Sequence, residues 1–182
     1  MAKRREWRQG DLYIGMYDGM MEASVLKILA RHQRNSFDLV FTPYESCGFG
    51  FPYIKVLDLT GTQYSSGYQG QGLSSLLVNI GLQVLKSRFP PDSLVEGRVS
   101  DVDDQLTPLD LREACHRRRI AFWQSFGFWV VEEEGRSPLI TAALSQLSEK
   151  REGVVLGRYP RFIPLEQFYE VARFNWWLGL VS

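Results

Sequence analysis

A glycine-rich turn that runs directly into a strongly periodic helix constrains this sequence more than any other feature. The turn is Gly67-Tyr-Gln-Gly-Gln-Gly72, and the helix predicted behind it covers Leu73 to about Ser87. Apolar side chains recur in that helix at i, i+3, i+4, i+7 and i+11, namely Leu73, Leu76, Leu77, Ile80 and Val84. This spacing places them on one helical stripe, which must be buried against another part of the fold.

The same turn is suited to bind an anion. Gly70 and Gly72 can adopt backbone angles that other residues avoid, so several N–H groups can point at one ligand, and the helix dipole favours negative charge there. A P-loop is excluded, because no lysine lies between Lys55 and Lys86. A dinucleotide fingerprint, and with it a nucleotide-dependent oxidoreductase, is only weakly indicated, because Ser75 stands where the third glycine is needed.

Composition bounds the class of protein. A chain of 182 residues is long enough for one domain with a proper core. The net charge of zero argues against a broad attraction to nucleic acid or to anionic lipid. Two cysteines and two histidines are too few for a disulfide framework or a zinc site. We therefore expect a cytoplasmic protein without a metal, a secretory signal or a membrane span.

The pattern of apolar residues and helix signals predicts an alternating series of elements. We expect residues 1–10 to form a loose basic arm, 11–182 a single domain, and 136–182 a divergent C-terminal extension. Predicted strands cover residues 12–17, 37–43, 51–59, 93–99, 128–133 and 153–159, and predicted helices cover 20–32, 73–87, 107–126, 137–150 and 165–177. Arg118 falls within the apolar face of the predicted helix 107–126, so we expect it to pair with a carboxylate such as Asp58 or Glu96, or to reach a ligand phosphate. The last helix is a possible homodimer contact.

Two motifs resemble those of one enzyme family. Gln69-Gly-Gln-Gly-Leu-Ser74 resembles the Gln/Arg-x-x-Gly-x-Gly/Ala pyrophosphate loop of the GCN5-related N-acetyltransferases, with Gly72 as its central glycine and Ser74 in place of Gly or Ala. Phe122-Trp-Gln-Ser-Phe-Gly-Phe128 resembles the aromatic-aromatic-x-x-x-Gly-Phe end of a later helix in that family. The two motifs occur in the family's order with a predicted strand between them, which is more specific than either motif alone.

The resemblance implies a fold and a co-substrate. The fold would be a mixed, mainly antiparallel central sheet with helices on both faces, of the acyl-CoA N-acyltransferase kind, with extra C-terminal helices. The reaction would transfer an acetyl group from acetyl-CoA directly to a primary amine in a ternary complex. The strand before the loop would splay from its neighbour and polarise the thioester carbonyl through its backbone near Leu59, and Trp123 would adjoin the cofactor. The pyrophosphate would be held by backbone N–H groups of Gln69, Gly70, Gln71, Gly72, Leu73 and Ser74.

Two carboxylates are candidates for the general base that deprotonates the amine. Asp58 shares a predicted strand face with Ile54 and Val56, and an acidic residue on this strand or its neighbour often serves as base in the family. Glu96 lies on the predicted strand 93–99 and could accept the proton directly or through water. The alternative role for Glu96 is a cross-strand pair with an arginine.

The residue that would act as general acid in the family is replaced in this sequence. The family commonly has a tyrosine that protonates the leaving thiolate at the position of Trp123, and an indole cannot do this. His116, Tyr64, Tyr68 or water would then supply the proton. The alternative function is a catalytically inactive binding or interaction protein that keeps the fold, which Trp123, the long loop before the glycine-rich turn and the extra C-terminal helix favour.

Overall fold

The structure is a computed structural model, described here for residues 3–20, 25–44, 53–61, 68, 70–100 and 108–171. Its helices are α1 (Leu73–Arg88) and α2 (Leu109–Gln124), with short 3-10 helices η3 (Leu144–Gln146) and η4 (Leu165–Gln167). Its strands are β1 (Lys3–Gln9), β2 (Leu12–Met20), β3 (Val25–His32), β4 (Asn35–Tyr44), β5 (Tyr53–Gly61), β6 (Leu94–Arg98), β7 (Trp129–Glu133), β8 (Arg136–Ala143), β9 (Val154–Val155), β10 (Tyr159–Pro160) and β11 (Tyr169–Glu170). Within these ranges no helix is long and apolar enough to cross a membrane.

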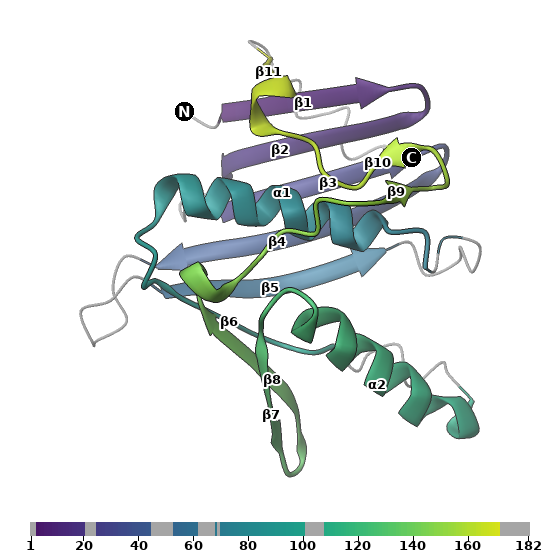
Figure 1. The fold of residues 1–182 in the computed structure, drawn as a ribbon, viewed down its shortest axis with the longest axis vertical. Helices are drawn as coiled ribbons and strands as arrows, with labels where there is room; N and C mark the ends of the chain where they lie inside the picture. The colour runs from purple at the N-terminus through teal and green to yellow at the C-terminus, as the bar shows by residue number, and fades with distance from the viewer. Residues whose placement is uncertain are drawn as a thin grey trace.

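One large sheet organises the described part of the chain. Its nine strands follow the order β11-β1-β2-β3-β4-β5-β6-β8-β7, and β9 and β10 form a separate hairpin (Figure 1). Every neighbouring pair in the large sheet is antiparallel except β5 and β6, which are parallel. The parallel pair is joined through α1, because parallel strands need a crossover connection. The prediction of a mixed, mainly antiparallel sheet is confirmed.

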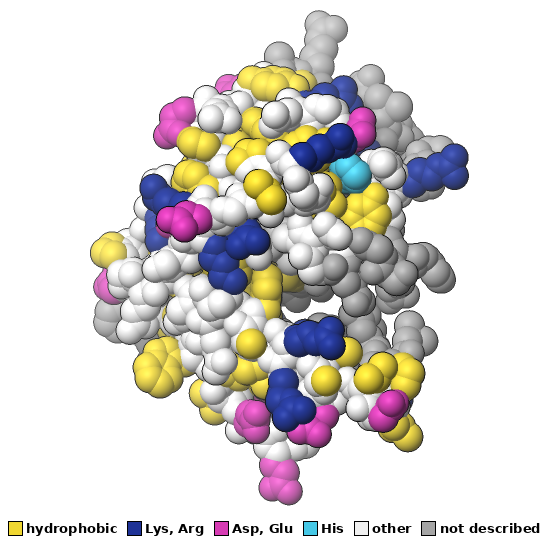
Figure 2. Space-filling model, turned by 45° about the vertical axis from the view of Figure 1, so that its right-hand side comes forward, with side chains coloured by type: hydrophobic (Ala, Val, Ile, Leu, Met, Phe, Trp, Pro, Cys, Tyr) yellow, Lys and Arg dark blue, Asp and Glu magenta, His cyan; other side chains and the backbone are white. Residues whose placement is uncertain are grey.

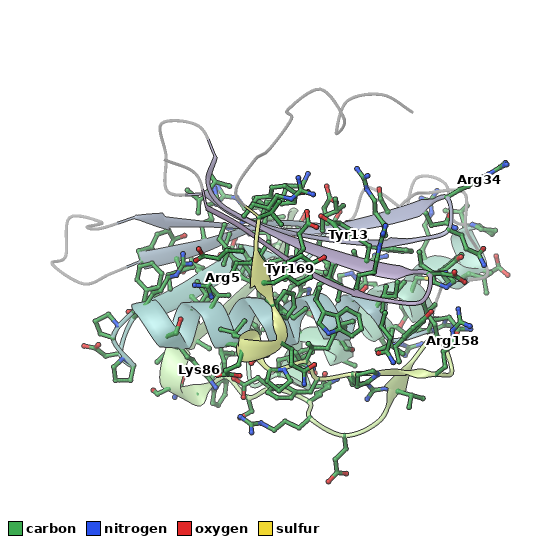
Figure 3. All side chains as sticks on the ribbon, turned by 90° about the horizontal axis from the view of Figure 1, so that it is seen from above. Arg5, Tyr13, Arg34, Lys86, Arg158 and Tyr169 are labelled. Atoms are coloured by element: carbon green, nitrogen blue, oxygen red, sulfur yellow. The ribbon has the colours of Figure 1, made fainter. Side chains whose placement is uncertain are left out.

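Helix α1 is buried on two sides rather than along one stripe. It lies along one face of the strands (Figure 3), where Gly81 approaches β4 so closely that a Cβ atom there would lie 2.4 Å from the ring of Phe41. The chain around β9 and β10 passes across the helix (Figure 1). Most of the helix, including Val78, Asn79 and Leu82, is consequently buried. A helix covered on two sides can be apolar almost all round, as this one is.

The buried amide of Asn79 ties the C-terminal extension to α1. Its nitrogen donates hydrogen bonds to the carbonyl oxygens of Lys150 (2.8 Å) and Arg161 (2.9 Å), and its oxygen accepts one from the Lys150 backbone N–H (2.8 Å). One turn later, Gln83 donates to the carbonyl oxygen of Ile163 (3.0 Å). These bonds satisfy backbone groups of an extension that has little secondary structure of its own.

The first two predicted elements differ from the structure. Residues 1–10, expected as a loose arm, contain β1, which pairs with β2 over its whole length. The helix expected over residues 20–32 is wrong, because β3 occupies Val25–His32 and pairs with β2 and β4. Leu26, Ile28 and Ala30 are buried in alternation, and this period-2 pattern, rather than the helical spacing, decides the local structure.

The predicted C-terminal helices are also wrong within the described residues. Residues 137–150 contain β8, whose alternate residues Ile140 and Ala142 are buried where it lies between β6 and β7. The segment 165–177 begins as the 3-10 helix η4 and continues as β11, which pairs with β1. Residues 172–182 lie outside the described residues, so a homodimer through this segment stays a prediction.

We expect Asn79→Ala to lower the free energy of unfolding by roughly 2–5 kcal/mol, because two carbonyls and one N–H would lose buried partners. Gln83→Ala is the matched control on the same helix, since it removes one hydrogen bond and should cost only about 1 kcal/mol. Urea unfolding followed by circular dichroism measures both values. Equal losses for the two variants would contradict the anchoring role of Asn79.

Candidate functional site

The glycine-rich turn has the backbone geometry of an anion site. Gly70 and Gly72 have φ angles of 75° and 83°, in the left-handed region that favours glycine. The N–H of Gln71 donates to the carbonyl of Tyr68 (3.2 Å), and α1 begins at Leu73 without a side-chain cap or an acidic residue in its first turn. The first N–H groups of a helix have no partner within the helix. They are therefore free to bind a negative group at the positive end of the dipole.

The β9–β10 hairpin holds this turn in place. The N–H of Leu156 donates to the carbonyl of Gln71 (2.9 Å). A Cβ atom at Gly72 would lie 3.4 Å from both the carbonyl oxygen of Val154 and a methyl group of Val155. A glycine is thus required at position 72 by its φ angle and favoured by its neighbours. Gln69, the first residue of the motif, lies outside the described residues.

A buried histidine contacts Tyr68 of the glycine-rich turn. Nδ1 of His32 lies 3.0 Å from the hydroxyl of Tyr68, and the Tyr68 ring also packs on Phe37, with 5.7 Å between ring centroids. His32 is only 7% exposed, and its Nε2 has no hydrogen-bond partner among the described residues. The sequence interpretation missed this contact because it placed His32 at a helix end. The signal available was the alternation that puts His32 in phase with Ile28.

Strands β5 and β6 separate in the middle of the sheet. They pair in parallel from Tyr53 opposite Leu94 to Val56 opposite Gly97, and β5 then continues to Gly61 beside β4 alone. At the last pair the strands approach so closely that a Cβ atom at Gly97 would lie 2.9 Å from both Cβ and the carbonyl oxygen of Val56. Beyond it, the backbone of β5 no longer has β6 as a partner. Since β6 itself ends one residue later, at Arg98, the splay that the resemblance implies stays a prediction.

A β-bulge lies where the two strands separate. Asp58 lies opposite Val40, whereas Val56 lies opposite the next residue of β4, so Leu57 is an extra residue in β5. The bulge breaks the alternation on which the expected common face of Asp58 and Val56 depended. Leu59, expected on the other face, instead packs against the core to which Val56 belongs. The side chain of Asp58 is not among those described.

Glu96 lies on the sheet face directed away from α1, because its neighbour Val95 fills the core. Its carboxylate is half-buried and accepts a hydrogen bond from the hydroxyl of Tyr53 (3.2 Å). The predicted pair with a cross-strand arginine is not formed, because the residues opposite Glu96 on the neighbouring strands are Lys55 and Thr141. Glu96 therefore retains acceptor capacity at the point where β5 and β6 separate.

Helix α2 ends in a cluster of aromatic rings. Trp123 is 6% exposed and meets Phe122 and Phe128 edge to face, with 5.2 and 5.4 Å between ring centroids. His116 is half-buried and lies two turns before Trp123, about 10 Å along the helix. Arg118 is exposed rather than central to an apolar face, because α2 buries only its C-terminal end.

Tyr68 and Glu96, two of the predicted catalytic residues, lie in different places. Tyr68 lies with the glycine-rich turn, beside Phe37, which pairs with Gly61 at the end of β5. Glu96 lies opposite Lys55 of β5. Lys55 is six residues before Gly61, which is about 20 Å along β5. The surface is hollowed between the part that carries α1 and the part that carries α2, with a basic side chain at the lower edge (Figure 2). An elongated ligand that passes between β5 and β6 would connect the two places.

Comparison with known proteins adds one structural similarity. No protein-family model and no curated protein matches the sequence. The fold is similar to that of Arabidopsis thaliana Naa50, solved in complex with the bisubstrate analogue CoA-Ac-MVNAL, with a TM-score of 0.43 and 15% sequence identity. The similarity covers 64% of this chain and 71% of that chain. A similarity of this extent carries no functional conclusion.

We expect Gly72→Ala to weaken the binding of inorganic pyrophosphate by about tenfold, because an alanine would resist the left-handed φ angle that directs the N–H groups. Gly135→Ala is the control, since Gly135 has a φ of 72° with open space around it and lies in the turn between β7 and β8. Isothermal titration calorimetry measures the affinities. Unchanged pyrophosphate affinity in Gly72→Ala would contradict an anion site at this turn.

Proposed function

We propose that this protein is an acetyl-CoA-dependent N-acetyltransferase that acts on a primary amine. One observation carries the proposal: the parallel strands β5 and β6 separate at a bulge, and the far end of β5 leads to the anion-binding N-terminus of α1. A ligand with a negatively charged end and a long arm fits this arrangement. Acetyl-CoA has that form and carries its acetyl group as a thioester.

Two sets of backbone groups bind the two parts of acetyl-CoA. The backbone N–H groups of Leu73 and Ser74, with those of the turn before them, hold the pyrophosphate. The backbone of β5 from Leu57 to Leu59, which lacks β6 as a partner, polarises the thioester carbonyl. Because these donors are fixed by the sheet and the helix, they need no rearrangement when charge develops on the carbonyl oxygen.

Glu96 acts as the general base. The amine attacks only when it is neutral, and its nitrogen then loses a proton as the C–N bond forms and the C–S bond breaks. Glu96 faces the side of the sheet away from α1, so the amine approaches from the face opposite the cofactor's phosphates. Tyr53 holds the carboxylate in place through the 3.2 Å hydrogen bond. The thiolate takes its proton from water or from His116, because the indole of Trp123 has no acidic group that could donate one.

A catalytically inactive binding protein is the second candidate. The specific observation in its favour is Trp123, which has no acidic hydroxyl and is 6% exposed. Such a protein would keep the cofactor site and lack turnover. The two candidates differ in whether acetyl-CoA is consumed in the presence of an amine.

The first test is calorimetric titration with acetyl-CoA. We expect binding that Gly72→Glu abolishes, because a carboxylate would occupy the anion site and repel the phosphates. NAD is the control ligand, since it carries a pyrophosphate without the pantetheine arm. If acetyl-CoA does not bind at millimolar concentration, the proposed function is wrong.

We expect Glu96→Gln to lower kcat by about 10²-fold or more while the KM for acetyl-CoA stays unchanged, because a general base contributes typically 10²–10⁴-fold to the rate. Glu132→Gln is the matched control, an exposed acidic residue on β7. Steady-state kinetics with a panel of primary amines gives both parameters. An unchanged kcat in Glu96→Gln would exclude this residue as the base.

A further inference from the structure

Two basic side chains in the C-terminal extension have no carboxylate partner among the residues that the structure describes. Neither Lys150 nor Arg161 takes part in any ion pair with a described residue, whereas the adjacent Glu149 is already engaged by Lys86 (3.2 Å) and Arg151 (3.9 Å). The Nε of Arg161 is also buried without a hydrogen-bond partner in that part of the chain. Two neighbouring cations without a counter-ion are costly unless a ligand supplies the negative charge.

Lys150 is held between the two helices. Its backbone is fixed to α1 by Asn79, and its ammonium lies 4.5 Å from the centre of the Phe126 ring, just beyond the end of α2. Burial, with the nearby charge of Arg161, lowers the pKa of Lys150. The aromatic ring compensates only part of the lost hydration. A bound anion at this position would stabilise the charged ammonium.

Arg161 lies close to the glycine-rich turn. Its guanidinium carbon is 3.2 Å from the position of a Cβ atom at Gly153. The carbonyl of the next residue, Val154, is in turn 3.4 Å from the position of a Cβ atom at Gly72. The Arg161 backbone is fixed by Asn79, which lies seven residues or about 10 Å along α1 from Gly72. Asn79 thus fixes the backbones of both basic residues about two helical turns from Gly72.

We propose that Lys150 and Arg161 form a second anion subsite, which binds the 3′-phosphate of acetyl-CoA while the N-terminus of α1 binds its pyrophosphate. This inference rests on the proposed function. In coenzyme A the 3′-phosphate and the pyrophosphate are attached to the same ribose, so binding of one at Gly72 places the other a short distance away. A guanidinium and an ammonium together match the charge of a phosphate monoester and can donate several hydrogen bonds to it.

The test compares acetyl-CoA with 3′-dephospho-acetyl-CoA as ligands of the full chain, by isothermal titration calorimetry. The variants are Lys150→Met, which keeps the aliphatic stem over Phe126, and Arg161→Gln, which leaves the backbone bond to Asn79. The matched control is Arg158→Gln, because Arg158 lies in the same hairpin region and pairs with Asp11 (3.0 Å). Thermal unfolding of each variant verifies that it folds.

We expect the wild-type protein to bind acetyl-CoA at least about tenfold more tightly than 3′-dephospho-acetyl-CoA, because only acetyl-CoA can accept charge-assisted hydrogen bonds from Lys150 and Arg161 at its 3′-phosphate. Lys150→Met and Arg161→Gln should each lose most of this preference and bind the dephospho ligand as the wild type does. Arg158→Gln should keep the preference. Raising the salt concentration should reduce the preference in the wild type.

Three results would overturn the inference. Tight binding of both ligands with equal affinity by the wild type would leave the proposed function standing and exclude the second subsite. Equal weakening of both ligands by the variants would show that the two cations act elsewhere than on the 3′-phosphate. Absence of binding by either ligand would overturn both the subsite and the proposed function.

Discussion

The candidate site depends first on how one buried amide fixes the C-terminal extension to α1. Asn79 is completely buried and makes three hydrogen bonds to the backbone of Lys150 and Arg161. Because an unpaired buried amide is costly, these bonds hold only one register of the extension on the helix. That register places β9 against Gly72, the ammonium of Lys150 near the end of α2, and the guanidinium of Arg161 beside Gly153.

A second constraint acts in the sheet itself. The parallel pairing of β5 with β6 ends at Val56 and Gly97, and the bulge at Leu57 shifts the register of β5 against β4 at the same level. Beyond this point, β5 pairs with β4 but not with β6 within the part of the chain that the structure describes. Buried backbone groups need hydrogen-bond partners, which the rest of the chain, water or a ligand can supply.

Prediction from sequence succeeded where a local signal and the tertiary environment agree. The helix behind Gly72 was predicted to within a residue or so, because its apolar spacing and the proline pair after it act locally. It failed for residues 25–32 and 137–150, where short apolar segments have both helical and alternating patterns. In these segments the neighbouring strands supply the hydrogen bonds that decide between a helix and a strand.

The sequence by itself determined the glycine-rich turn and the helix that follows it, because a left-handed φ angle and a 3.6-residue period are local properties of the chain. Tertiary structure alone decided which side chains surround the site. His32 contacts Tyr68, 36 residues later in the chain, and Tyr53 contacts Glu96, 43 residues later. Asn79 of α1 bonds to the backbones of both Lys150 and Arg161, which lie 71 and 82 residues after it. Such contacts depend on strand register and on packing between distant segments, which no local pattern in the sequence specifies.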